Sequence, residues 1–197
     1  MRVSSTALSF AGLDRLPGVD AACIFVSEDD RPLHGLGGLI DWRLCGMLSR
    51  VLKDGRFIGA LGDTLLMPSA GRIPAQRIFC VGVGPRAELN LHALGRVMRR
   101  AADVMSMARS RSFLTELPPS PSYAPAEAGG SFLVHCAGAF KGEQIVLAGE
   151  AWSILKELGS KPMPAGVECD KEPIPSPTPG STQPKPKPLT PAKARPG

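Results

Sequence analysis

Aromatic side chains, long apolar runs and paired cysteines are all scarce in this sequence of 197 residues. Phe, Trp and Tyr make up 5% of it, so the aromatic residues that alternate with basic ones on many nucleic-acid surfaces are missing. No stretch approaches the ~18 apolar residues of a membrane-spanning helix, and the N-terminal segment MRVSSTALSFAGLDR has no apolar run of signal-peptide length. We therefore expect a soluble, cytoplasmic protein with neither a membrane nor a nucleic acid as its partner.

Patterns for metal and thiol chemistry are also missing. The five cysteines stand singly, with no Cys-x-x-Cys pair, at Cys23, Cys45, Cys80, Cys136 and Cys169. An odd number without framework spacing favours reduced thiols. The three histidines fall in no zinc-ligand spacing, and the acidic residues are scattered except for Glu28–Asp30, which we interpret as solvated loop charge. We predict no metal and no cofactor.

The positive charge lies mostly at the C-terminal end. The formal net charge is +5, but residues 160–197 carry six Lys or Arg against three Asp or Glu. Eleven of those 38 residues are proline. Such a segment buries too little apolar surface to offset its ordering entropy, so we expect residues 160–197 to be a disordered Pro/Lys-rich tail. The basic balance is thus weak evidence for a nucleic-acid partner.

The rest of the chain is organised around residues 77–86, which read RIFCVGVGPR. The apolar run from Ile78 to Val81 is typical of a strand covered on both faces. Gly82 and Gly84 then allow a turn, and an amphipathic helix follows over residues 88–109. A buried strand that leads through a glycine turn into a helix is the building block of α/β domains, so we predict an α/β fold.

Similar patterns extend this fold over residues 1–159, which we expect to form one domain. Further strands are predicted over residues 2–10, 19–27, 63–67, 112–117 and 144–148, and further helices over 39–53, 126–140 and 150–158. Residues 12–18 are expected to form a connection. Trp42 lies off the apolar stripe of its predicted helix, where it packs at the helix margin or anchors a partner.

Two glycine clusters stand before predicted helices and are candidate phosphate cradles. Gly82, Gly84 and Ala87 satisfy the Gly-x-Gly-x-x-Ala pattern of dinucleotide sites. However, the acidic residue expected about 20 positions later falls at Asp103, inside a helix, and Pro85 lacks the N–H that a phosphate needs. A structural turn is therefore favoured over dinucleotide binding.

The second cluster consists of Gly35, Gly37 and Gly38, just before the first long helix. A glycine loop that leads into a helix can hold an anion by its backbone N–H groups. The candidate ligand-binding residues are therefore Gly35, Gly37, Gly38, Gly82 and Gly84, and a nucleotide ligand stays open.

No nucleophile stands in a catalytic arrangement. His135 and Cys136 are neighbours on a predicted helix and do not face one another. Ser69 lies in MPSAG, where Met67 occupies the first glycine position of the Gly-x-Ser-x-Gly elbow. We predict no catalytic residue. The arginines of the helix over residues 88–109 are interpreted as a solvated face rather than a nucleic-acid surface.

The order of these elements, and five stretches of sequence, resemble the N-terminal domain of the M17 leucyl aminopeptidases. The matching stretches are VDAACIFVSEDDRPLHGL, LIDWRLCGMLSRVL, FIGALGDTLLMPSAGR, RIFCVGVGP and ELNLHALGRVMRRAADVM. They lie within residues 19–118, with a looser fit to residue 158. The resemblance implies a three-layer, macro-domain-like fold, in which a mixed, mostly parallel sheet lies between helices.

In that family the chemistry belongs to a second domain, which has a two-metal site of Lys, Asp and Glu ligands and an NTDAEGRL signature. Nothing here matches that signature, so no catalytic residue is carried over, and the resemblance implies an N-terminal module standing alone. Macro domains that bind ADP-ribose also begin with a VDA strand, matched by Val19–Ala21. Their Asn-Ala-Asn continuation is replaced here by Ile24–Ser27.

Three hypotheses follow. The first is a non-catalytic interaction or regulatory module that associates with itself or with an unidentified protein partner. The second is a macro-like binder of ADP-ribose or another nucleotide, motivated by the two glycine clusters. The third is an accessory subunit of a metalloaminopeptidase.

Overall fold

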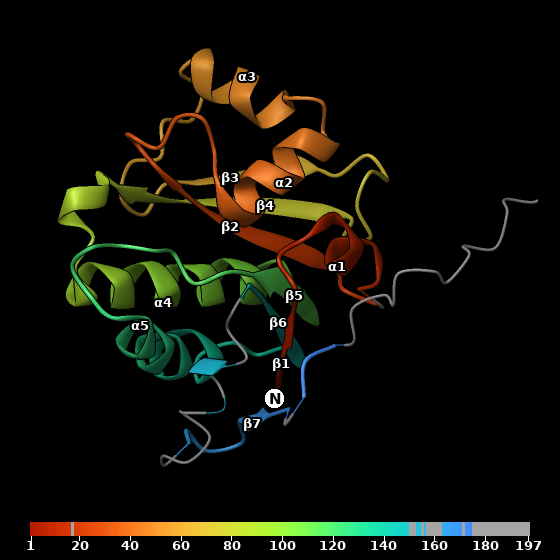
Figure 1. Cartoon of the computed structure of the whole chain (residues 1–197), viewed down its shortest axis with the longest axis vertical. Helices are drawn as coiled ribbons and strands as arrows, with labels where there is room; N and C mark the ends of the chain where they lie inside the picture. The colour runs from red at the N-terminus through yellow and green to blue at the C-terminus, as the bar shows by residue number, and fades with distance from the viewer. Residues whose placement is uncertain (17, 150–152, 155, 157–162, 171, 175–197) are drawn as a thin grey trace, which may run out of the picture.

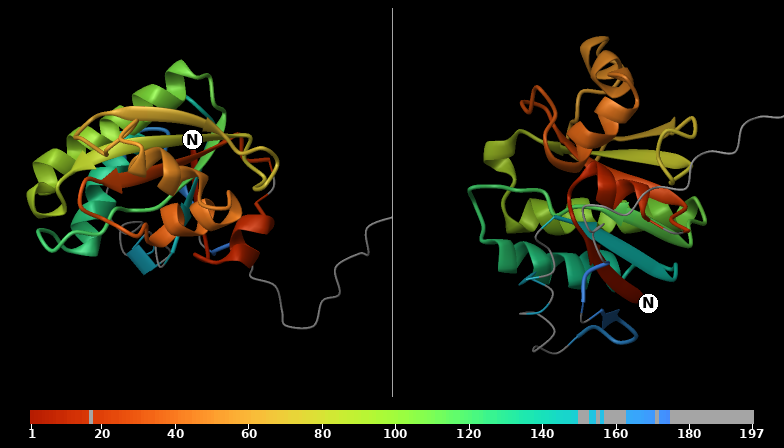
Figure 2. Two further views of the ribbon diagram at one scale, coloured as in Figure 1. Left: turned by 90° about the horizontal axis from the view of Figure 1, so that it is seen from above. Right: turned by 45° about the vertical axis from the view of Figure 1, so that its right-hand side comes forward.

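The computed structural model describes residues 1–16, 18–149, 153–154, 156, 163–170 and 172–174. Within these residues one sheet forms in the order β3-β4-β2-β5-β6-β1-β7, with helices on both faces (Figures 1 and 2). The strands are β1 (Arg2–Thr6), β2 (Ala21–Ser27), β3 (Thr64–Pro68), β4 (Arg77–Gly84), β5 (Ser112–Thr115), β6 (Gln144–Ala148) and β7 (Glu168–Cys169). Neighbouring strands are parallel except for β3 and β4. The predicted α/β fold with a mixed, mostly parallel sheet is confirmed.

Two groups of helices cover the two faces of the sheet. One face carries α1 (Phe10–Asp14), α2 (Gly35–Arg43) and α3 (Met47–Lys53), and the other carries α4 (Leu91–Met107), α5 (Pro125–Ser131) and the π-helical turn η2 (Phe132–Ala137). Because successive strand residues point to opposite faces, Cys23 is buried with α4 and Ile24 with α2. The central strands are thus covered on both sides, which explains their continuous apolar runs.

The helix predicted over residues 39–53 is in fact two helices. α2 already begins at Gly35, and the break before α3 falls at Cys45 and Gly46, whose φ angles are 55° and 73°. The carboxylate of Asp41 accepts the backbone N–H groups of Leu48 at 2.9 Å and Ser49 at 3.1 Å. Asp41 therefore caps α3. The apolar stripe continues across the break, so periodicity alone could not reveal it.

The turn predicted at Gly82 and Gly84 is wrong, because β4 continues to Gly84. Both glycines allow the loop 59–62 to lie directly against the strand. The Gly62 N–H donates to the Gly82 carbonyl at 2.9 Å, and the Gly84 N–H donates to the Gly59 carbonyl at 2.9 Å. The residues are glycine because a backbone approaches them, not because the chain reverses there.

Other boundaries also differ from the predicted ones. The strands predicted over residues 2–10 and 112–117 end at Thr6 and Thr115. The expected connection over residues 12–18 contains part of α1, which Ser9 caps by accepting the Gly12 N–H at 3.1 Å. α4 starts at Leu91, after a 3-10 turn, η1 (Arg86–Glu88). The helix predicted over residues 126–140 is α5 followed by η2. The helix predicted over residues 150–158 lies mostly outside the described residues.

Part of the expected tail adds to the sheet. β7 pairs with β1, and beyond it the Asp170 N–H donates to the Val3 carbonyl at 2.8 Å and the Ile174 N–H to the Ser5 carbonyl at 2.7 Å. These residues cover an edge of β1 that would otherwise be open, so here the structure differs from the expected solvated tail. Residues 175–197 lie outside the described residues, and the domain boundary at residue 159 stays a prediction.

We expect Gly82→Ala to destabilise the fold by about 3 kcal/mol. A methyl group there would lie 2.7 Å from the Gly59 carbonyl oxygen and closer still to that of Ala60. Urea denaturation followed by circular dichroism measures the loss. In the control, Gly130→Ala, the methyl meets no atom within 4 Å, and the change lies in α5, so stability should rise by about 0.5–1 kcal/mol. Equal stabilities of the two variants would contradict this packing.

Candidate functional site

A groove runs along the edge of the sheet at which the parallel strands end. In α/β sheets the carboxyl ends of the strands are the usual place for a ligand. A cavity of about 690 Å³ opens at this edge and shares Glu116 and Gly35 with an adjoining hollow of about 60 Å³. We refer to the two together as the edge groove. Its walls include Leu8, Gly35, Glu116, Tyr123 and Gly149.

The carboxylate of Glu116 fills the anion position at the start of α2. Its Oε2 atom accepts the Leu36 N–H at 2.9 Å. His34, which precedes the helix, makes no capping hydrogen bond with its side chain, so a residue from the end of β5 caps α2 instead. Gly35 has a φ of 57°, and a methyl group there would lie 2.5 Å from the same Oε2 atom. A side chain at position 35 would therefore displace the carboxylate.

Burial is the main reason why the pKa of Glu116 is raised, and the charge of Asp30 adds to the rise. The backbone N–H groups of Leu36 and Gly37 and the charge of Arg86 act in the opposite direction. Removal from water thus outweighs the hydrogen bonds that favour the anion. Glu116 keeps its proton to a higher pH than an ordinary glutamate does.

A second carboxylate, that of Asp29, accepts a backbone N–H group just after β4. Asp29 accepts the Ser27 hydroxyl and, at 3.1 Å, the Arg86 N–H, and these hydrogen bonds lower the pKa of Asp29. The neighbouring Asp30 lies 3.0 Å from the Nδ1 atom of His34 and accepts from the Arg86 guanidinium at 3.3 Å. Glu28 and Asp29 are exposed, as the interpretation of Glu28–Asp30 as solvated loop charge expects, whereas Asp30 is half-buried and paired with His34 and Arg86.

The structure separates the five glycines that were predicted to bind a ligand. Gly35 lines the edge groove beside Glu116, and Gly37 lies within α2. A methyl group at Gly38 would approach the Leu33 carbonyl oxygen to 2.6 Å, which accounts for that glycine by packing. Gly82 and Gly84 contact the loop 59–62 instead of the groove.

Sequence reasoning missed the two carboxylates that occupy the predicted cradles. Asp29 and Glu116 are far apart in the chain, and no motif joins them. One indication was available: Asp29 follows one predicted strand and Glu116 stands near the end of another, and the carboxyl ends of parallel strands meet at one edge. Strand order could not be deduced from local patterns, so neither residue could be matched with its glycine loop.

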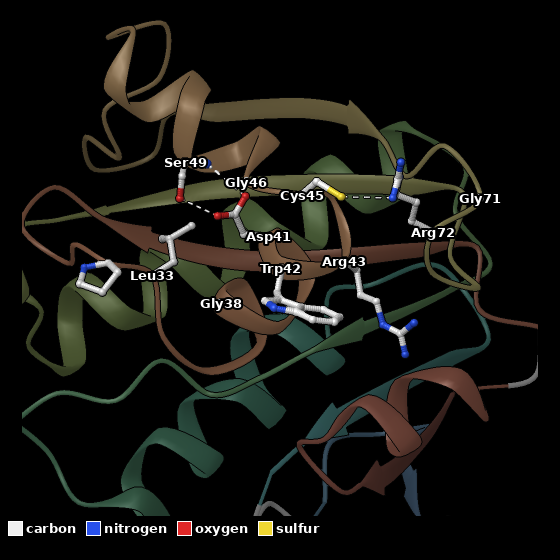
Figure 3. A pocket seen from close by; sticks show the side chains of 11 residues that line it. Leu33, Gly38, Asp41, Trp42, Arg43, Cys45, Gly46, Ser49, Gly71 and Arg72 are labelled. Carbon is white, nitrogen blue, oxygen red and sulfur yellow. Dashed lines mark hydrogen bonds between the residues drawn. The ribbon is translucent and has the colours of Figure 1, made fainter.

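A second cavity, of about 860 Å³, lies beside the break between α2 and α3 (Figure 3). The Trp42 side chain is 68% exposed and contacts the Phe10 ring, with 4.7 Å between the ring centroids. Arg43 lies over the same Phe10 ring at 5.0 Å and pairs with Asp14 at 2.6 Å. Phe10 thus packs against the indole, and most of the Trp42 side chain is exposed to solvent.

One wall of this cavity has a basic group and the opposite wall has an acidic group. The Arg72 guanidinium donates to the Cys45 Sγ atom at 3.3 Å, whereas Asp41 and Ser49 line the other wall and hydrogen-bond to each other at 2.5 Å (Figure 3). Among the described residues, no carboxylate lies within ion-pair distance of Arg72. We refer to Trp42, Arg43, Cys45 and Arg72 together as the Trp42 surface.

Other candidates for chemistry are not brought together. Ser69 is buried at the end of β3, and Cys136 is buried whereas its neighbour His135 is exposed. In the described part of the chain, no three side chains of His, Cys, Asp or Glu are grouped so that they could hold a metal ion. Of the helices described, none is long and apolar enough to cross a membrane.

Comparison with solved structures identifies the class of fold. The chain is similar to the Oceanobacillus iheyensis macrodomain with ADP, with a TM-score of 0.56 and 14% identity over 72% of this chain and 83% of that one. It is also similar to a tomato leucine aminopeptidase mutant, with a TM-score of 0.52 and 16% identity over 79% of this chain and 35% of that one. The fold is therefore macrodomain-like.

Sequence comparison identifies the family. The N-terminal domain of the cytosol aminopeptidase family matches residues 23–135, more than half of the chain, so the chain belongs to this family. A probable cytosol aminopeptidase of Thermosynechococcus vestitus is 31% identical over 98 residues, which are 50% of this chain and 20% of that protein. The chain spans about a fifth of the length of the curated relatives that it matches. The resemblance to M17 aminopeptidases is confirmed.

We expect Glu116→Gln to stabilise the protein at neutral pH. The amide oxygen can still accept the Leu36 N–H, but no charge has to be buried. The pKa of Glu116 is raised in the folded state, so the ionised side chain costs stability above that pKa and costs none below the unfolded value. The difference from wild type should therefore shrink as the pH falls through the raised pKa. Thermal unfolding between neutral and acidic pH measures it.

Glu127→Gln is the matched control for this change. Glu127 is exposed, and its carboxylate accepts the Ala124 N–H at 2.7 Å at the start of α5. Its replacement should not raise stability at neutral pH. A Glu116→Gln variant that is less stable than wild type at neutral pH, and no less stable at acidic pH, would show that the cap outweighs the burial of charge.

Proposed function

We propose that this chain is a non-catalytic interaction module that binds a protein partner through the Trp42 surface. The observation that carries the proposal is the Trp42 indole, 68% exposed and braced by Phe10. Trp and Arg are the residues most enriched where a few side chains carry most of the binding energy of an interface. Here they stand beside a cavity that a partner's side chain can enter.

The chemistry of this surface indicates the kind of partner. An apolar side chain would pack on Trp42, and a carboxylate would bind the guanidinium of Arg72, which has no ion-pair partner among the residues that the structure describes. Because Arg43 is already paired with Asp14 and lies over the Phe10 ring, it is less available to a ligand than Arg72. The partner is accordingly a protein that presents an apolar residue beside an acidic one.

Family membership suggests two candidate partners. One is a second copy of this chain, and the other is an aminopeptidase subunit that carries the metal site, for which this chain would be an accessory subunit. In either case this domain of the aminopeptidase family would serve assembly and not catalysis. Association with a pure aminopeptidase and self-association are separate measurements, so the experiment distinguishes the two.

We expect Trp42→Ala to weaken association by about 2 kcal/mol or more, roughly 30-fold in the dissociation constant. Sedimentation velocity of the pure chain, and of its mixture with a cytosol aminopeptidase from the same cells, measures this effect. Met107→Ala is the control, because Met107 is 78% exposed on α4, away from this surface. A protein that stays monomeric and leaves the aminopeptidase unbound, or that associates equally well without Trp42, would contradict the proposal.

A second candidate function is the binding of ADP-ribose or a related nucleotide in the edge groove. Its support is the cavity at the carboxyl edge of a macrodomain-like sheet, together with the similarity to a macrodomain that was solved with ADP. The carboxylates of Glu116 and Asp29 argue against it. They already accept the N–H groups of Leu36 and Arg86 and would repel a diphosphate.

We expect no binding of ADP-ribose by the wild-type protein at neutral pH and millimolar ligand, measured by titration calorimetry. The Glu116→Gln variant separates the charge of this residue from its shape. If the variant bound the ligand and the wild type did not, the carboxylate charge would be the barrier. Measurable heat from the wild type would instead favour the nucleotide-binding function over our first proposal.

A further inference from the structure

A third cavity, of about 490 Å³, lies between α4 and the π-helical turn η2, away from both the edge groove and the Trp42 surface. It is unusually basic. Its lining includes three arginines and two histidines but one acidic residue, and these are His92, Arg96, Arg99, Arg100, Asp103 and His135. We refer to it as the α4 hollow.

The periodicity of α4 places most of these groups on one side. His92, Arg96 and Arg99 are spaced by four and three residues, so they form a single ridge along the helix. The opposite side, which includes Leu94, Val97 and Met98, is buried against the sheet. At about 1.5 Å per residue the ridge extends for roughly 10 Å, which is longer than one carboxylate or one phosphate group.

The remaining histidine reaches the hollow because of two features of the backbone. His135 belongs to the six-residue π-helical turn η2, a rare conformation that is frequent at functional sites. It also lies directly over Gly95 of α4, where a methyl group would come within 3.1 Å of the imidazole ring. Glycine in the interior of a helix costs stability, and here its absence of a side chain makes room for the imidazole.

The positive charges of the arginines in the hollow are poorly neutralised by the described side chains around them. Asp103 is 3.9 Å from Arg99, a long and exposed pair. The Arg100 Nε–H donates to the Gly62 carbonyl at 3.3 Å, which fixes the guanidinium without cancelling its charge. In the part of the chain that the structure describes, Arg96 has no carboxylate within ion-pair distance.

We propose that the α4 hollow binds a ligand with several linked phosphate groups, such as a short linear polyphosphate. Guanidinium groups bind phosphate through paired hydrogen bonds, and a row of cations matches a row of anions. Of the residues that the structure describes, no Phe, Tyr or Trp lines the hollow, so these residues provide no such ring for stacking a nucleic-acid base. Recognition therefore rests on the phosphate groups.

Titration calorimetry of the full chain with tripolyphosphate tests this assignment. We expect saturable binding that weakens as salt is added, and binding at least about tenfold weaker in the double variant Arg96→Gln/Arg99→Gln. Lys53→Gln/Arg56→Gln removes the same charge from the exposed end of α3 and should bind like wild type. Thermal unfolding of each variant verifies that it is folded.

His135→Gln provides a second test that leaves the arginines in place, and we expect it to weaken binding several-fold. Two further arms compare orthophosphate and duplex DNA at equal phosphate concentration. Equal affinity for orthophosphate would overturn the assignment to linked phosphates, and tighter binding of DNA would overturn it in favour of a nucleic-acid surface. No heat with millimolar tripolyphosphate, or equal losses in both double variants, would also refute the proposal.

Discussion

The hydrogen bond from the Leu36 N–H to the carboxylate of Glu116 joins the start of α2 to the end of β5. α2 has no cap of its own, so its first turn depends on this contact from across the sheet. The same contact decides what the edge groove can hold. The N-terminus of a helix is a natural anion site, and here the carboxylate of Glu116 fills it.

Because Glu116 fills the anion position in the edge groove, we look for binding at the Trp42 surface and the α4 hollow. Glu116 and Asp29 accept backbone N–H groups at the edge, and the accessible side-chain donors elsewhere include Arg72 beside Trp42 and the arginines of α4. The chain belongs to an aminopeptidase family and spans about a fifth of the length of its relatives, and we propose that its outer helices are the binding surfaces. Assembly and anion recognition are the functions that we propose for them.

Much of the fold could be predicted because its strands and helices follow from local patterns of apolar residues. The apolar run of β4 and the stripe of α4 identify a buried strand and the helix that covers it. The break at Cys45 and Gly46 could not be predicted, since it depends on Asp41 capping α3. Of the candidate site, Gly35 was recognised from its pattern, whereas Glu116 required knowledge of which strand ends lie side by side.

Nuclear magnetic resonance of Glu116 and of the Leu36 amide tests most directly whether the carboxylate occupies the start of α2. We predict that the Glu116 carboxyl carbon titrates above the ordinary glutamate value, that the Leu36 amide proton shifts with the same midpoint, and that this amide is protected from exchange with solvent. A Leu36 amide that exchanges freely, together with a Glu116 that titrates like an exposed glutamate, would mean that the anion site is open.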